Sequence, residues 1–104
     1  MRNSTSESYY SKRISYILNT KNRADRLKKA LVLLREYKGL DDELIIIDGA
    51  STDNTGSVVN EFSDIIDIFI SEPDLNGPEA TNKGMLLSSG EYIKQIMDDD
   101  IFYK

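Results

Sequence analysis

Apolar residues along the chain form short continuous runs that alternate with runs of helical spacing. The run 44–47 is Leu-Ile-Ile-Ile with no polar residue, which is typical of a parallel strand covered on both faces. Leu27, Leu31 and Leu34 recur three or four positions apart, so they give a helix one buried face. Four strands are expected, at 14–19, 44–47, 65–70 and 91–97. Three helices are expected between them, one from Asn22 to Gly39, one around 58–62 and one from Pro78 to Gly90.

This alternation of strands and helices predicts an α/β fold. Right-handed crossovers place helices on both faces of the sheet, which gives a Rossmann-like three-layer sandwich with a mostly parallel sheet of about four strands. Residues 1–13 are polar and Ser-rich, without the hydrophobic region of a secretory signal, so we expect a flexible leader followed by one domain, 14–104. Gly84, inside the third helix, either lets a neighbouring element approach closely or is simply tolerated.

The composition narrows the chemistry. With 39% apolar and 30% charged residues, the 104-residue chain is expected to be soluble and globular. It has no cysteine and no histidine, which excludes disulfides, thiolate nucleophiles and the commonest general base. A net charge of −5 argues against nucleic acid as a partner.

The polar loops that follow the predicted strands are the candidate site, because ligands of such sheets bind beyond the carboxyl ends of the strands. Three loops fall there, at 20–23, 48–54 and 98–100. The last is Asp98-Asp99-Asp100, whose adjacent carboxylates repel one another and suit a hard divalent cation such as Mg²⁺ or Mn²⁺. Taken singly, Asn22 and Ser51 are also explained as helix caps, and Asp48 as the end of a strand.

Four segments, in order, resemble the nucleotide-binding half of family 2 glycosyltransferases with the GT-A fold. The resemblance runs from about Ile14 to Tyr103. Its segments are I-L-N-T-K-N-R-A-D-R-L at 17–27, I-I-I-D-G-A-S-T-D-N-T at 45–55, S-E-P-D…G…A-T-N-K-G within 71–84, and S-G-E-Y-I at 89–93 leading to D-D-D at 98–100. The last corresponds to the D-x-D motif of the family.

The resemblance implies a role for each matching residue. Nucleotide-binding positions are Thr20, Asn22, Asp48, Asp98 and Asp99, and Asp98 and Asp100 would hold Mn²⁺ or Mg²⁺. The implied activity is the inverting transfer of a sugar from a nucleoside-diphosphate sugar, with UDP favoured, to a glycan or lipid-linked glycan. The expected location is the cytoplasm, either in solution or at the cytoplasmic face of the membrane.

The chain also departs from the family pattern. Asn19 replaces a proline, Lys21 an aromatic residue and Gly49 a second acidic residue, which removes one expected nucleotide contact. No residue is assigned as the catalytic base, and the isolated chain is expected to be inactive in transfer.

The alternative function is a non-catalytic nucleotide-sugar-binding or assembly module that needs a partner chain. An exposed fourth strand would allow self-association. A receiver domain is disfavoured, because the third strand ends in Phe-Ile-Ser without a phosphorylatable aspartate.

Overall fold

The computed structural model describes residues 12–73 and 76–97, which form a four-stranded sheet in the order β3-β2-β1-β4. Every pair of neighbouring strands is parallel. The strands are β1 (Lys12–Thr20), β2 (Glu43–Asp48), β3 (Ile68–Ser71) and β4 (Gly90–Met97). The expected α/β class and parallel sheet are confirmed.

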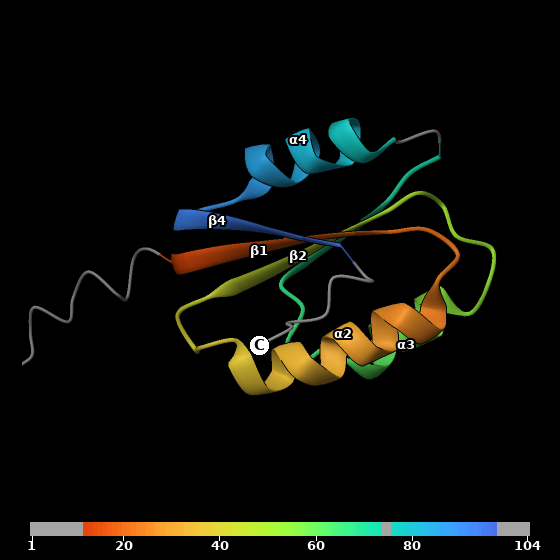
Figure 1. Ribbon diagram of the computed structural model, residues 1–104, viewed down its shortest axis with the longest axis horizontal. Coiled ribbons are helices and arrows are strands. Elements are labelled where there is room, and N and C mark those ends of the chain that lie inside the picture. Colours follow the sequence, from red (N-terminus) through yellow and green to blue (C-terminus); the bar gives the residue numbers. More distant parts are fainter. Residues whose placement is uncertain (1–11, 74–75, 98–104) are drawn as a thin grey trace, which may run out of the picture.

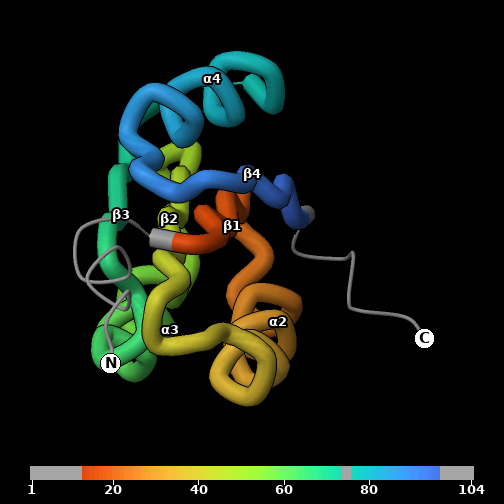
Figure 2. Tube along the Cα trace, turned by 90° about the vertical axis from the view of Figure 1, so that its left-hand side faces the viewer, coloured from red at the N-terminus to blue at the C-terminus, as the bar shows by residue number. Residues whose placement is uncertain are grey.

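Helices cover both faces of this sheet. α2 (Ala24–Tyr37) and α3 (Thr55–Glu61) lie together on one face, and α4 (Gly77–Leu87) lies on the other (Figure 1). The view turned by 90° separates the three layers, with α4 above the strands and α2 below them (Figure 2). The expected three-layer sandwich is therefore correct.

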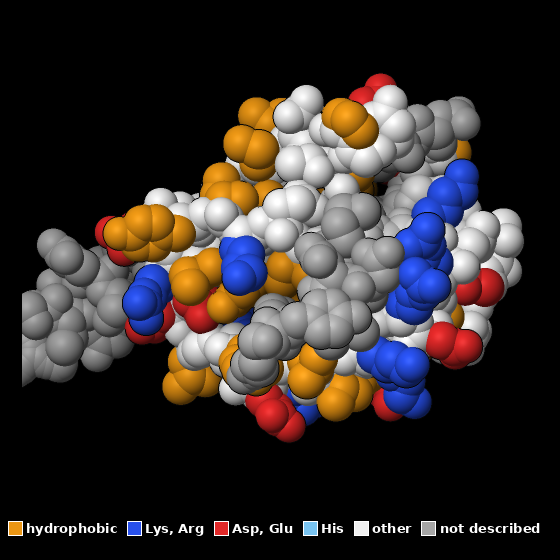
Figure 3. Space-filling model, viewed as in Figure 1, with side chains coloured by type: hydrophobic (Ala, Val, Ile, Leu, Met, Phe, Trp, Pro, Cys, Tyr) orange, Lys and Arg blue, Asp and Glu red, His pale blue; other side chains and the backbone are white. Residues whose placement is uncertain are grey.

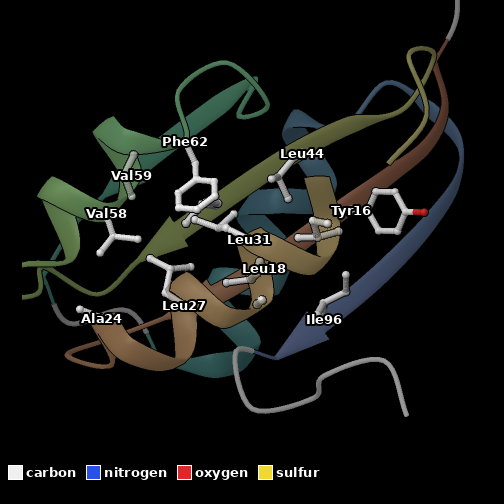
Figure 4. Packing of buried hydrophobic residues seen from close by; sticks show 13 residues of the cluster. Tyr16, Leu18, Ala24, Leu27, Leu31, Leu44, Val58, Val59, Phe62 and Ile96 are labelled. Atoms are coloured by element: carbon white, nitrogen blue, oxygen red, sulfur yellow. The ribbon is translucent and has the colours of Figure 1, made fainter. Parts of the chain in front are cut away.

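The main core lies between the sheet and the α2 and α3 layer. Leu18 from β1 contacts this core together with Leu27 and Leu31 from α2 and Phe62 after α3, all of them buried (Figure 4). A second cluster, Ile45, Ile47 and Ala80, forms under α4. Successive side chains of a strand point to opposite faces, so β2 supplies both clusters, which explains why it has no polar position between its ends.

α4 approaches β1 closely through a glycine. A Cβ atom added at Gly84 would lie 2.5 Å from Cγ2 of Ile17, which is completely buried. Of the two readings of Gly84, the structure therefore supports close approach of a neighbouring element.

Several element boundaries differ from those expected, among them the end of α4 at Leu87 rather than at Gly90 and the starts of two strands. β1 begins at Lys12, so the last two residues assigned to the leader belong to the strand, and the N–H of Arg13 donates to the carbonyl of Asp41 at 2.8 Å. β3 begins at Ile68 rather than at Ile65. The N–H of Ile65 instead donates to the carbonyl of Phe62 at 3.0 Å, in a turn whose apolar side chains pack on the main core.

Candidate functional site

The carboxyl ends of the strands bring the first two predicted loops together. In the strand register Thr20 lies beside Asp48, and Asp48 lies beside Ser71. The N–H of Gly49 donates to the carbonyl of Thr20 at 3.0 Å, which joins the two loops directly after the strands. β4 ends at Met97, paired with Asn19, at this same edge. Asp98, Asp99 and Asp100 lie outside the described residues.

The carboxylate of Asp48 is turned into the protein. Asp48 is only 2% exposed. Its Oδ2 accepts from the N–H of Ser51 at 2.9 Å and from the hydroxyl of Ser71 at 2.8 Å, and its Oδ1 accepts from the Ser51 hydroxyl. Asp48 thus shapes the β2–α3 loop and joins it to β3, and both carboxylate oxygens have partners within the protein.

Asn22 connects the β1–α2 loop with the β2–α3 loop. Its backbone is in the left-handed region, with φ of 51°, which asparagine tolerates better than most residues. Its Oδ1 accepts from the N–H of Thr52 at 2.7 Å and of Asp53 at 3.3 Å, and its own N–H donates to the Ser51 hydroxyl at 2.7 Å. The expectation that Asn22 caps the following helix is wrong, because the N-cap is Arg23 and its side chain makes no capping bond.

The cap of α2 comes instead from Asp53, which the sequence reading did not select. One carboxylate oxygen accepts from the N–H of Ala24 at 3.1 Å, at the start of α2. The other accepts from the N–H of Thr55 at 3.1 Å and from its hydroxyl at 2.5 Å, at the start of α3. The Thr55 hydroxyl is the main cause of a lowered pKa for Asp53, with backbone donors adding to it and desolvation opposing it. The Ser-Thr-Asp sequence after a strand was the available signal, since these residues favour caps.

A hollow of about 380 Å³ opens between these loops and the start of α4. The predicted residues Thr20 and Asn22 both line it, whereas Asp48 is not among its lining residues. Its described walls are Asn19, Thr20, Lys21, Asn22, Arg23, Ile47, Gly49, Asn76, Gly77 and Ala80. Two of the three described nucleotide-binding candidates thus line one cavity, and their role in binding stays a prediction.

Asn19, the residue in place of the family's proline, joins α4 to the edge of the sheet. Its Nδ2 donates to the carbonyl of Gly77 at 3.3 Å and to the hydroxyl of Thr81 at 3.1 Å. The first turn of α4 is fixed further by Asn76 and Glu79, each of which accepts from the other's N–H, at 2.8 and 3.1 Å. The start of α4, which forms one wall of the hollow, is thus both capped and hydrogen-bonded to β1.

Positive charge is concentrated at this end of the acidic chain. Lys and Arg side chains gather at the right-hand end of the molecule, over the β1–α2 loop and the start of α2 (Figure 3). Lys21, Arg23 and Arg26 belong to that stretch. The arrangement can attract an anionic ligand, because clustered charges of one sign raise its local concentration.

Comparison with known proteins gives a consistent result. Residues 15–104 match the family described as Glycosyl transferase family 2. The chain is 34% identical over 92 residues to GalNAc(5)-diNAcBac-PP-undecaprenol beta-1,3-glucosyltransferase of Campylobacter jejuni, covering 85% of this chain and 30% of the relative. It is 30% identical over 98 residues to the poly(ribitol-phosphate) beta-N-acetylglucosaminyltransferase TarP of Staphylococcus aureus, covering 89% of this chain and 30% of that relative.

Solved structures agree with the fold. Mannosyltransferase PcManGT from Pyrobaculum calidifontis, in complex with GDP-Man and Mn²⁺, has a TM-score of 0.75 at 25% identity, over 88% of this chain and 29% of that one. Glucosyl-3-phosphoglycerate synthase from Mycobacterium tuberculosis has a TM-score of 0.68 at 23% identity, over 88% of this chain and 35% of that one.

The chain spans about 30% of the length of the curated relatives that it matches. Within the described residues, no helix is both long enough and apolar enough to cross a membrane. The family match covers all but the first 14 residues of the sequence and agrees with the parallel α/β fold and the loops at its carboxyl edge. The chain therefore belongs to glycosyl transferase family 2.

Proposed function

We propose that this chain binds the nucleoside-diphosphate sugar of a glycosyltransferase in the hollow at the carboxyl edge of its sheet. The observation that carries the proposal is the convergence of Thr20, Asn22 and the start of α4 on one cavity beneath a basic rim. Asn22 and Asp48 contribute by holding the loops in place, so that the walls of the cavity are formed before the donor binds. A preformed site loses less conformational entropy on binding.

The proposed metal ligands are Asp98 and Asp100, with Asp98 and Asp99 also near the nucleotide. The sequence continues into this triplet directly after β4, whose last residue pairs with Asn19 at the edge of the hollow. Carboxylate oxygens suit Mn²⁺ or Mg²⁺, and Mn²⁺ is present in the two structural neighbours described above. Such a cation, when bound, offsets negative charge on the departing diphosphate.

The acceptor of the sugar is proposed from the relatives alone. One curated relative is named for a polyprenol diphosphate-linked glycan and another for poly(ribitol-phosphate), so we propose a glycan or lipid-linked glycan as acceptor, reached in the cytoplasm or at the cytoplasmic face of the membrane. The family resemblance favours a UDP-sugar, whereas the neighbours contain both guanine and uracil nucleotides. The neighbours therefore do not fix which nucleotide base this chain binds, and the residues of its own pocket determine that choice.

Calorimetric titration with UDP and GDP, each with and without Mn²⁺, tests donor binding. We expect binding that depends on Mn²⁺ and that falls at least tenfold in Asp100→Asn, because one charged ligand to the cation is lost. Glu36→Gln, an exposed carboxylate on α2, is the control and should bind like the original chain. Equal binding without Mn²⁺, or unchanged affinity in Asp100→Asn, would refute the metal role, and failure of both nucleotides to bind would refute the donor site.

A further inference from the structure

The charged side chains in the described walls of the hollow, Lys21 and Arg23, are hydrogen-bond donors only. Among its described lining residues are two cations, Lys21 and Arg23, and no carboxylate. The nearest carboxylate in sequence, Asp48, is 2% exposed and accepts hydrogen bonds from Ser51 and Ser71. No acidic side chain of the described walls is thus available to a base N–H.

Lys21 occupies the space that a larger residue at position 49 would take. A Cβ atom added at Gly49 would lie 3.1 Å from Cδ of Lys21 and 3.5 Å from both its Cβ and its Cγ. Gly49 does not have a positive φ, so no backbone strain calls for glycine there. The missing side chain instead lets the lysine stem lie across Gly49, while Lys21 itself remains exposed along the wall of the hollow.

The ammonium of lysine has three donors and no acceptor, which restricts the edge of a base that it can recognise. Guanine presents O6 and N7 as adjacent acceptors, and lysine is one of the common partners of this edge. On uracil, the N3–H donor separates the two carbonyl oxygens, so a single ammonium reaches one acceptor rather than two adjacent ones. The chemistry at positions 21 and 49 therefore favours guanine.

We propose that Lys21, lying across Gly49, is a specificity-determining residue that makes this site prefer a guanine nucleotide to a uracil nucleotide. The inference rests on the proposed donor site and names the class of donor, a GDP-sugar. It replaces the preference for UDP that the family resemblance alone implied.

Titration of the full chain with GDP and UDP at fixed Mn²⁺ tests this preference. We expect GDP to bind about tenfold more tightly than UDP, the discrimination expected for one good side-chain contact to a base edge. Lys21→Met keeps the apolar stem and removes the ammonium, so it should lower GDP affinity about tenfold and leave UDP affinity within about threefold. Lys29→Met, an exposed lysine on α2, is the matched control and should change neither.

Each other result has a defined meaning. Equal or tighter binding of UDP overturns the base preference and leaves the donor site standing. An equal loss of affinity for both nucleotides in Lys21→Met has the same meaning, because Lys21 would then contact a part that both ligands share. Binding of neither nucleotide overturns the donor site itself. Gly49→Asp supplies an acceptor and displaces the lysine stem, so a shift of its preference toward UDP would support the proposal independently.

Discussion

At the scale of single residues, Asp53 links the starts of two helices at the edge of the site. One carboxylate accepts hydrogen bonds from the starts of both α2 and α3, at Ala24 and Thr55, and its own N–H donates to Asn22. Helix N-termini carry unpaired N–H groups and a partial positive charge, so an ionised carboxylate stabilises both helices at once. Asp53 thereby fixes two loops that border the hollow.

Asp53→Asn should lower the midpoint of urea unfolding at neutral pH, because the amide keeps one uncharged acceptor oxygen and places an NH₂ donor where the other carboxylate oxygen accepted. The pKa of Asp53 is lowered in the folded protein, chiefly by the Thr55 hydroxyl, so folding favours the ionised form. Its contribution is therefore complete above the pKa of the unfolded chain and is lost as pH falls through the lower pKa of the folded state. The difference between Asp53→Asn and the original chain should accordingly shrink on acidification.

Unfolding curves at several pH values between neutral and acidic conditions measure that difference. Asp41→Asn, at an exposed position before β2, has the same charge change and is the control. A gap between Asp53→Asn and the original chain that stays constant down to the lowest pH would contradict the role of the ionised carboxylate.

These residue roles also show where sequence reasoning reached its limit. Thr20 and Asn22 could be placed at the site, because each follows a strand whose direction was predicted from its apolar run. The partners of Asn22, however, lie about 30 positions away in another loop. Local sequence favours Asn22 as a cap for the next helix, and only the tertiary arrangement assigns that cap to Asp53.

At the scale of elements, the contact between α4 and β1 determines how close one wall of the hollow lies to the sheet. Gly84 faces Ile17, and Asn19 binds the first turn of the same helix.

The order of all the elements was predictable from the alternation of strand and helix patterns. The start of β3 was not, because Ile65 and Ile66 are as apolar as strand residues but pack on the main core from a turn.

Gly84→Ala should destabilise the fold by up to about 2 kcal/mol. Alanine gains roughly 1 kcal/mol in helix propensity, but its Cβ would lie 2.5 Å from the buried Cγ2 of Ile17, and such overpacking costs about 1–3 kcal/mol or more where neighbours cannot move. Gly56→Ala in α3 is the matched control, since its Cβ would meet nothing within 4 Å, and it should be neutral or stabilising by about 0.5 kcal/mol. Free energies of unfolding from urea titration compare the two, and similar values would argue against close packing at Gly84.

At the scale of the whole molecule, the sheet has two edges, β3 and β4, among the described residues. β4 pairs with β1 on one side, and its other side presents backbone groups without a strand partner in the described part of the chain. Tyr92 and Ile93 on this strand are 67% and 45% exposed. The expected self-association through the fourth strand remains a prediction. Because β4 lies at an edge of the sheet, the strand through which two copies would pair can be named.

We predict that the chain self-associates through β4 and that Ile93→Lys weakens this association about tenfold. The variant removes an apolar side chain that is half available for burial, worth roughly 1.4 kcal/mol, and places a second charge beside Lys94 on the edge strand. Sedimentation velocity over a range of concentrations measures the effect. Val32→Lys is the control, because Val32 is similarly exposed at 46% but lies on helix α2 rather than on an edge strand. Equal weakening by both variants would place the contact elsewhere, and a chain that stays monomeric at all concentrations would contradict the prediction.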